Sequence, residues 1–567
     1  MEGRVYKFDY LPEVPADIRV VVGIDFGTTF SGFAYANVSS GEVISNEDWP
    51  GIKGPKKLPT VLQYDESFSQ VTLWGFDALA REPPRRRKKV TSTVSRPIEL
   101  FKLHLGDIPE KQKPILPSNI TAEKAITDYL QEMGIIKEEV EKCWPGIDFF
   151  KMVRLMITVP AGFTEDTKTI MRQCMYNANL ISISGTQSLK FTTEPEAAAV
   201  HCMKVIKDHG LKIGDKYLVV DCGGGTVDLT VRKLLENNQL GEDTERSGDF
   251  CGSTYVDKEF IKYLKKKVGE NAIKMLSEKH YSQLSYMVQQ FCERVKTRFT
   301  GVESEFRPYS LEIEKICPAL KQYVSGNVRD ELSEEEDWEI EFDFTTVKSF
   351  FDPVIRKILQ LINDQINKNV CSIIFLVGGF SESKYLQKRV RQKFSNYKVA
   401  VPPHPMAAIA RGAVEYGLDM DKIKTRVVKW TYGIELYSEF DKGDPLSRKT
   451  SDGLISKFKP MAKRGLQVEI NQKFSTLACP RYPNQDCILF KFFYTPNETA
   501  KFIDEPGMNK LGEFRVELSD KHLGLNRPVT LTLCFGAMEI IAEAKNEING
   551  KVYRTTFQLE LSEMSSM

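Results

Sequence analysis

The same short pattern of residues occurs twice in this chain, and it constrains the fold more than any other feature. In GIDFGTTFSG an apolar run ends at Asp25, and Gly27 follows after one residue; in VVDCGGGTVDL, Asp221 and Gly223 have the same spacing. Hydroxyl residues come next in both, and apolar residues then resume. Each segment is predicted to form a buried strand, a tight turn and a second strand. A pattern that occurs twice indicates duplicated halves that face one cleft.

The two turns are rich in groups that bind anions. Glycine turns expose successive backbone N–H groups, which bind phosphate oxygens, and threonine hydroxyls add further donors. A carboxylate at the end of each strand can hold the water shell of Mg²⁺, which takes few direct protein ligands. One such turn alone would be a weak sign, because glycine-rich hairpins are common. The predicted phosphate-binding residues are Gly27, Thr28, Thr29, Gly223, Gly224, Gly225 and Thr226, with Asp25 and Asp221 near the metal through water.

A glycine pair ends a third apolar run. In FLVGGFSES, Gly378 and Gly379 separate a predicted buried strand from a predicted helix. Without side chains, these residues leave bare backbone on which a nucleoside can lie. Ordinary packing of a strand against a helix also uses glycine, so this segment alone leaves both interpretations open.

The chain is too long for a single core. A length of 567 residues corresponds to about two to four domains. We expect an N-terminal arm over 1–17, an α/β region over 18–420, a linker over 421–430 and a β-sandwich over 431–567. In the α/β region, helices are predicted over 121–142, 163–180, 193–206, 253–300 and 351–366, with Thr121 and Thr164 as N-caps.

Residues 431–567 differ from the rest of the chain in their pattern of apolar and polar residues. Short alternating runs such as LQVEINQKF and VTLTLCFG are separated by Gly, Pro and Asn, which is typical of a sandwich of short strands. The tripeptide ING at 548–550 predicts a hairpin. In contrast, the acidic stretch at 330–344 is expected to lie on the surface.

Composition limits the partners. The 78 basic and 77 acidic residues leave a net charge of +1, which argues against a nucleic-acid or membrane partner. The 11 cysteines form no C-x-x-C pair, which disfavours zinc and redox motifs, and their odd number favours free thiols in a reducing compartment. We expect a cytoplasmic location. The nucleus stays open, because PPRRRKKV at 83–90 is either a solvated charge run or a nuclear localisation signal.

Several motifs together resemble a known superfamily. DFGTTFSG, TEPEAAA, VDCGGGTVDL, CERVK and FLVGG occur in the order found in the actin-like ATPase fold, and they resemble the nucleotide domain of the 70-kDa heat-shock chaperones. The β-rich tail is similar in order to that family's substrate-binding sandwich, so the resemblance covers nearly the whole chain. The expected lack of a helical lid is similar to the family's divergent twelfth-type branch. The fold class implied is α/β, with two duplicated RNase H-like lobes around a nucleotide cleft followed by a β-sandwich.

The resemblance also implies a cofactor and site residues. ATP or ADP with Mg²⁺ would bind between the lobes. Glu194 matches the family's glutamate beside the catalytic water, and Lys102 either matches a phosphate-facing lysine or is an exposed surface lysine. Asp228 matches an acid with an interlobe hydrogen-bonding role. The implied catalytic set is Glu194, Asp25, Asp221 and Lys102, and the implied adenosine-binding set is Glu293, Lys296, Gly378 and Gly379.

Two of the departures of this sequence from the family concern the adenine pocket and the linker. Thr297 stands where the family has an arginine that stacks on adenine, and the neighbouring Arg298 is the candidate substitute. The family's linker is leucine-rich and acidic, whereas DKIKTRVVKW at 421–430 is basic and sparsely apolar. Coupling between nucleotide and tail requires a ligand that favours one docked state, and no such contact is evident from the sequence.

Three functions are open at this level. The leading hypothesis is an ATP-binding, weakly hydrolysing chaperone-like protein whose β-domain binds polypeptide clients by strand addition and works with co-chaperones. The second is a nucleotide-regulated, non-enzymatic scaffold that docks a specific protein partner through residues 431–567. The third, a sugar or metabolite kinase of the same fold, is disfavoured by the β-rich tail.

Overall fold

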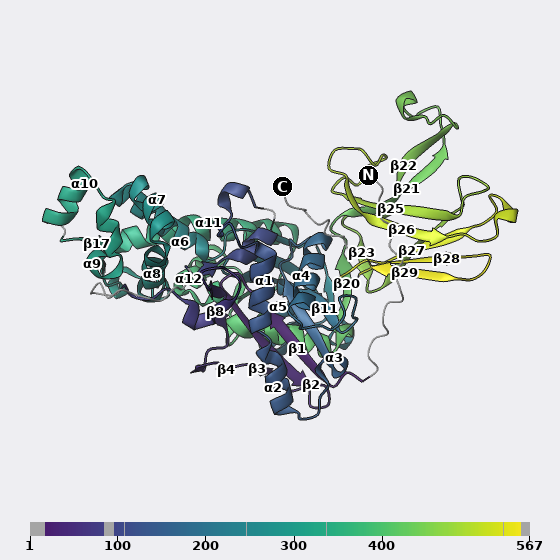
Figure 1. Cartoon of the computed structure of the whole chain (residues 1–567). Coiled ribbons are helices and arrows are strands. Elements are labelled where there is room, and N and C mark those ends of the chain that lie inside the picture. Colours follow the sequence, from purple (N-terminus) through teal and green to yellow (C-terminus); the bar gives the residue numbers. More distant parts are fainter. Residues whose placement is uncertain are drawn as a thin grey trace.

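The computed structural model describes residues 17–83, 96–106, 108–244, 246–335, 337–536 and 538–556. Residues 1–16 of the predicted arm, most of the basic stretch at 83–90 and residues 557–567 lie outside these ranges. The described part is a mixed α/β structure followed by a β-rich tail, as Figure 1 shows.

Two sheets in the α/β part share one plan. The first has the order β11-β10-β1-β2-β3 and the second begins β19-β18-β12-β13-β14. In each, the central strand pairs antiparallel with the next strand and parallel with a later one. The strands of the first sheet are β1 (Val20–Asp25), β2 (Phe30–Asn37), β3 (Ile44–Ser45), β10 (Val153–Val159) and β11 (Leu189–Thr193). Those of the second are β12 (Lys216–Cys222), β13 (Val227–Leu234), β14 (Leu240–Glu242), β18 (Ile373–Val377) and β19 (Lys398–Ala400).

This repeated strand order agrees with the duplication predicted from the two turns. Strands β1 and β12 lie in the middle of their sheets, and every residue of β1 is buried. Their sequences are continuous apolar runs because both faces of each strand are covered. Asp25 and Asp221 come at the carboxyl ends of these strands, where each turn begins.

Two helices pack between the sheets. They are α5 (Glu194–Ile206) and α13 (Ala408–Leu418), which share a core with residues of both sheets. A Cβ on Gly412 would lie 1.8 Å from the carbonyl oxygen of Ala197, so only glycine permits this close crossing. The crossing fixes the position of the first turn of α5, which carries Glu194.

The outer faces of the sheets are covered by the remaining helices. The first sheet is covered by α1 (Ala122–Glu132), α2 (Ile135–Cys143) and α4 (Glu165–Asn177). The second is covered by α6 (Thr254–Val268), α7 (Glu270–Lys279), α8 (Tyr281–Phe291), α11 (Phe344–Lys368) and α12 (Lys384–Lys393). Thr121 and Thr164 accept hydrogen bonds from backbone amides as N-caps, as predicted. The predicted helix over 121–142 is interrupted at Gly134.

The acidic stretch at 330–344 is only partly a surface segment, and that prediction was wrong for its apolar residues. Strand β17 (Glu339–Phe342) pairs with β16 (Tyr309–Glu312), and Ile340 and Phe342 are fully buried. The glutamates alternate with these residues because one face of the strand meets the core and the other meets water.

The tail consists mainly of two four-stranded antiparallel sheets that share one core. The first sheet has the order β22 (Leu454–Ala462), β21 (Thr431–Glu439), β25 (Cys487–Thr495) and β26 (Asn509–Glu517). The second has the order β24 (Gln472–Ala478), β27 (Val529–Phe535), β28 (Ile541–Asn546) and β29 (Val552–Thr556). The predicted hairpin at 548–550 is the turn between β28 and β29, where Gly550 has φ +72°.

The segment 421–430 is more than an extended connector. Its strand β20 (Ile423–Val427) pairs with β14, and β23 (Gln467–Glu469) then pairs with β20. The tail therefore contributes a strand to the second α/β sheet. The domain boundaries given above remain our proposal.

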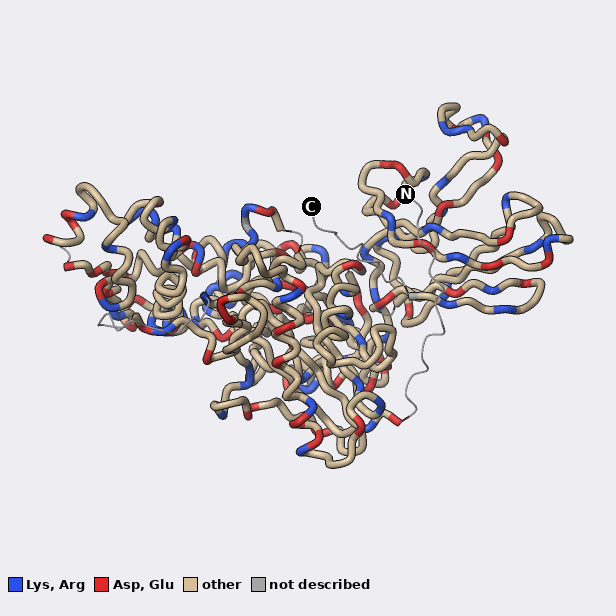
Figure 2. Tube along the Cα trace, viewed as in Figure 1, with Lys and Arg blue, Asp and Glu red and all other residues tan. Residues whose placement is uncertain are grey.

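Charge is spread evenly over this architecture. Figure 2 shows basic and acidic residues interspersed along the whole described trace, in keeping with the net charge of +1. Within the described ranges, every helix is too short or too polar to cross a bilayer.

Candidate nucleotide site

The two predicted phosphate-binding turns lie against each other. A Cβ on Gly224 would fall 2.2 Å from Oγ1 of Thr29, and one on Gly225 would fall 2.8 Å from Oγ1 of Thr28. Only glycine allows the turns to approach this closely. The fold thus brings together two segments that are far apart in the sequence.

The turns also present free donors. In the described structure, the backbone amides of Thr28, Thr29, Gly224 and Gly225 donate to no other residue. By contrast, the amide of Gly27 donates to Oγ of Ser31 at 3.1 Å and that of Gly223 to the carbonyl of Thr226 at 3.0 Å. The first set is suited to phosphate oxygens, and the second set holds the turns in shape.

Lys102 lies inside the site and is not a surface residue. It is 4% exposed, and its Nζ donates to Oε1 of Glu194 at 2.7 Å and to the carbonyl of Phe26 at 2.5 Å. The 3₁₀ turn Phe101–Leu105 carries this lysine. The structure therefore brings the predicted lysine and the predicted water-orienting glutamate into one ion pair beside the first turn.

A second lysine was missed from the sequence. Nζ of Lys57 lies 2.5 Å from Oδ2 of Asp25, and the side chains of Lys57 and Asp25 are 9% and 4% exposed. Lys57 precedes the short strand β6 (Leu58–Pro59), in a loop without any recognisable pattern. Nothing local in the sequence distinguishes it from a solvated lysine, because its partner is placed by the tertiary fold.

The site holds more negative than positive charge. Burial, together with the charges of Glu194, Asp228 and Asp25, raises the pKa of Asp221 well above its usual range. Burial and the charge of Glu194 raise the pKa of Asp228 to about 7, and burial also raises the pKa of Glu194. Oδ2 of Asp228 is buried without a hydrogen-bond partner. These groups are arranged as they would be around a cation.

The donor set fits Mg²⁺ held through water. In the parts of the chain that the structure describes, no three His, Cys, Asp or Glu side chains are grouped to ligate a metal directly. Mg²⁺ keeps most of its water shell and uses few protein ligands. Asp25 and Asp221, near the carboxyl ends of β1 and β12, could hold such a hydrated ion.

The glycine pair after β18 serves two purposes. Gly378 has φ +82°, and a Cβ there would lie 2.3 Å from Oδ1 of Asp221, so this residue lets β18 end beside the carboxylate. A Cβ on Gly379 would meet only Cε of Met406, at 3.5 Å. Gly379 therefore leaves open space of the kind expected beside a nucleoside.

Glu293 and Lys296 lie on a π-helical turn, Cys292–Lys296, that continues α8. Nζ of Lys296 pairs with both carboxylate oxygens of Asp257, at 2.7 and 2.9 Å. Glu293 is exposed and reaches only Gln290, at 3.5 Å. Neither residue is bonded to the turns, so their adenosine-binding role stays a prediction.

Hydrogen bonds join the two halves on either side of the turns. The amide of Ala161 donates to Oδ1 of Asp228 at 3.1 Å, which is the interlobe bond expected for Asp228. Further out, the hydroxyls of Tyr281 and Ser285 donate to Oε1 of Glu99, at 2.9 and 3.2 Å. Strand β9 (Ile98–Glu99) of one half is thus bonded to α8 of the other.

The first turn of α5 connects the site to the tail. Glu196, two residues after Glu194, is fully buried and pairs with Arg426 of β20 and with Arg232 and Arg246. Although burial acts in the opposite direction, the charges of these three arginines hold the pKa of Glu196 far below its usual range. Arg426 also donates to the carbonyl of Gly536 in the β27–β28 loop. This is the contact that the basic linker sequence did not reveal.

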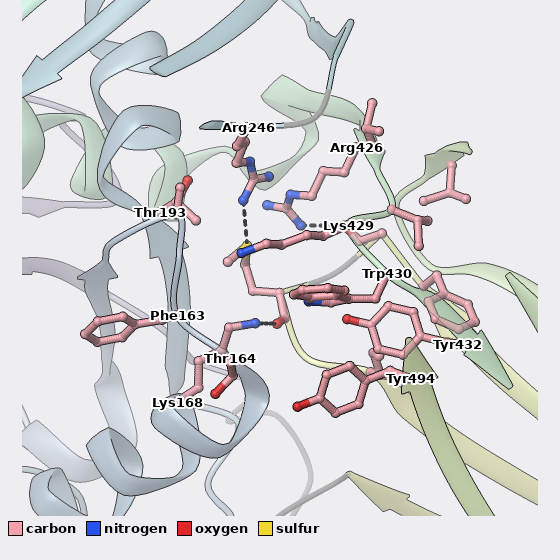
Figure 3. A pocket seen from close by; sticks show the side chains of 18 of the residues that line it. Phe163, Thr164, Lys168, Thr193, Arg246, Arg426, Lys429, Trp430, Tyr432 and Tyr494 are labelled. Carbon is pink, nitrogen blue, oxygen red and sulfur yellow. Dashed lines mark hydrogen bonds between the residues drawn. The ribbon is translucent and has the colours of Figure 1, made fainter. Parts of the chain in front are cut away.

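Figure 3 shows the cavity beside this contact, about 120 Å³ in volume, between α4, β20 and the tail. Lys168 donates to the carbonyl of Met538 at 2.5 Å, and Arg246 approaches Sδ of Met538 at 3.9 Å. Arg172 of α4 forms a bidentate pair with Glu539, with both bonds at 2.9 Å. The β27–β28 loop is therefore docked on the first half by charged groups.

Two sheets of the same plan, with an aspartate-glycine turn on each and a lysine–glutamate pair between them, fit the class of actin-like ATPases. The comparisons with known proteins are consistent with this class. Residues 213–401, which include most of the second sheet, match a family model described as "Domain of unknown function (DUF8340)".

Over most of its length, the chain is similar in sequence to 70-kDa heat shock proteins. It is similar to the human heat shock 70 kDa protein 12A, with 27% identity over 93% of this chain and 89% of that protein. Human heat shock 70 kDa protein 12B is 25% identical over the same shares. A chaperone protein HscA homologue from Aliivibrio fischeri is 22% identical over 74% of this chain and 63% of its own length.

Proposed function

We propose that this protein is a chaperone-like ATPase that binds Mg²⁺-ATP between its two sheets, hydrolyses it slowly and binds polypeptide through its tail. The single observation that carries the proposal is the convergence of the two aspartate-glycine turns around the Lys102–Glu194 pair. The similarity to heat shock 70 kDa proteins over nearly the whole chain supports it.

Each group has a role in this proposal. The amides of Thr28, Thr29, Gly224 and Gly225 would bind phosphate oxygens, and Asp25 and Asp221 would hold Mg²⁺ through water. When bound, the ion would neutralise charge that develops on the phosphates. Lys102 would lie against the same charge.

Glu194 can orient a water molecule. Its Oε1 accepts from Lys102, whereas its Oε2 accepts from no other described residue. A carboxylate oxygen free of protein partners can accept a hydrogen bond from water and align it for in-line attack. Because Lys102 also competes for this carboxylate, we expect the water to be activated weakly and hydrolysis to be slow.

Two measurements test the nucleotide part of the proposal. Calorimetric titration with ATP, ADP and GTP in the presence of Mg²⁺ should show one site and a preference for adenine. In single-turnover hydrolysis, Glu194→Ala should be at least tenfold slower than the wild type, whereas Glu303→Ala, at an exposed position, should not differ. Equal rates for wild type and Glu194→Ala would remove the water-orienting role.

The tail offers edges for polypeptide binding. In its sheets, β22, β26, β24 and β29 are the outermost strands. Leu477 on β24 is 59% exposed. An extended peptide can add to such an edge and place apolar side chains beside it. Binding of a fluorescent apolar peptide, compared with and without ATP, tests both client binding and its coupling to nucleotide.

A scaffold remains the second candidate, and one observation favours it. The tail is fixed to the first half by a bidentate arginine–glutamate pair and a buried arginine, which would hold one arrangement in place. If ATP binds but peptide affinity does not respond to it and no hydrolysis occurs, the scaffold is the better description.

A further inference from the structure

A second cavity, about 570 Å³ in volume, opens on the half that contains α8. It is lined by the turn that follows α8, with Arg294 and Arg298, and by the loop that leads into β16, with Arg307. A volume of this size holds a small organic molecule.

The cavity carries an excess of positive charge. The guanidinium groups of Arg294, Arg298 and Arg307 form no hydrogen bond or ion pair with any other described residue. The single acidic residue in the lining, Glu305, accepts a hydrogen bond from Oγ1 of Thr300 at 2.8 Å. The lining thus presents three guanidinium groups against one carboxylate. Guanidinium groups bind phosphate oxygens in a bidentate manner, which makes arginine the preferred residue for such recognition.

The floor of the cavity is apolar and firmly packed. Phe299 is 4% exposed, and its ring lies 5.1 Å from that of Phe351 in the core and 6.0 Å from that of Phe306. Phe306 and Tyr309 also line the cavity. Flat aromatic surfaces held in place by the core can receive the apolar body of a ligand while arginines at the rim hold its charge.

The cavity is distinct from the predicted nucleoside contacts. Neither Glu293 nor Lys296 lines it, and Lys296 is engaged by Asp257. The turn that carries Arg294 is π-helical, with the amide of Thr297 donating to the carbonyl of Cys292 at 3.0 Å. Such widened turns occur often at functional sites. Here the turn is followed by Arg298, on the same wall of the cavity as Arg294.

We infer that this cavity is a binding site for a small phosphate monoester with a flat apolar body. The three arginines and one glutamate of the lining give a net charge of +2. This charge is complementary to that of a phosphate monoester, which is about −1.5 to −2 at neutral pH. The aromatic floor receives the organic part. This site is independent of the proposed ATPase cleft, and Arg298 acts in it rather than as an adenine-stacking residue.

Calorimetric titration of the full chain with phenyl phosphate tests this inference. We expect one site, with affinity that falls as salt is raised. Inorganic phosphate and phenol, the two halves of the probe, should each bind at least tenfold more weakly. The double variant Arg294→Gln/Arg307→Gln should lose at least tenfold in affinity, and Arg356→Gln, at an exposed position on α11, should not change it.

Repeating the titration with saturating Mg²⁺-ADP separates this site from the cleft. Unchanged affinity supports a separate site. The inference is overturned if phenyl phosphate fails to bind, if the double variant binds like the wild type, or if Mg²⁺-ADP displaces the probe. Circular dichroism melts of each variant show whether the fold is intact, and Arg298→Gln alone replaces the double variant if that one unfolds.

Discussion

The buried ion cluster around Glu196 allows the loss of stability in two variants to be estimated from the number of charges that each variant leaves unpaired. Glu196 and Glu242 face Arg232, Arg246 and Arg426, and four of these five residues are 5% exposed or less. The variant Glu196→Gln keeps the shape of the side chain and leaves three guanidinium groups with one carboxylate. Removing one partner of a buried pair costs about 3–5 kcal/mol, because a charge stays buried without compensation.

The variant Arg426→Met should cost less. The wild-type cluster has three arginines and two carboxylates, and this variant leaves two arginines with two carboxylates, so the remaining charges balance. What is lost is the set of hydrogen bonds from Arg426 to Glu196, Tyr416 and the carbonyl of Gly536. Leaving a buried acceptor unpaired costs about 1–3 kcal/mol. Glu196→Gln is therefore expected to be the more destabilising variant. Loss of side-chain volume alone would make Arg426→Met the more destabilising one.

Urea titration followed by tryptophan fluorescence measures the free energy of the first unfolding transition. Arg554→Met, which removes the exposed Arg554–Glu543 pair of the tail, is the control and should cost less than about 1 kcal/mol. The reasoning is refuted if Glu196→Gln costs less than about 1 kcal/mol, or if Arg426→Met is the more destabilising of the two.

Three further predictions concern the contacts around the cleft. Burial raises the pKa of Glu99, so the folded state binds this proton more tightly than the unfolded state does. The free energy of unfolding therefore falls as pH rises from about 4.5 through the raised pKa. Glu99→Gln should flatten this part of a plot of Tm against pH, and an unchanged slope would contradict the prediction. Gly224→Ala places a methyl group into the first turn and should weaken Mg²⁺-ATP binding at least tenfold, whereas Gly185→Ala, which faces open space, should leave titrations unchanged. Arg172→Met removes the bidentate pair that docks the β27–β28 loop and should speed amide hydrogen exchange in β27 and β28; equal exchange would show that the pair does not hold the loop.

Features set by neighbouring residues were predictable from the sequence. The apolar runs before Asp25 and Asp221 are continuous because β1 and β12 are covered on both faces, and glycine follows because the turns must approach each other. The N-caps Thr121 and Thr164 and the hairpin at Gly550 depend on one or two residues in place. Each of these signals is complete within a short stretch of chain.

Features that depend on distant partners were not predictable. Lys57 is one basic residue among several in its loop, and only the tertiary fold places it against Asp25. Arg426 belongs to a basic segment that resembles a solvated connector, yet its counter-charge, Glu196, comes from the start of α5. The acidic stretch gave a wrong prediction for the same reason, because Ile340 and Phe342 are buried in a core that residues outside the stretch, such as Phe260, complete.

The most direct test of the central claim is a crystal structure of the protein soaked with Mg²⁺-ADP. Our account predicts phosphate density between the Thr28–Thr29 turn and the Gly223–Gly225 turn, with a hydrated ion beside Asp25 and Asp221. Density for the nucleotide elsewhere, or turns that stay packed together with no phosphate between them at saturating nucleotide, would contradict it.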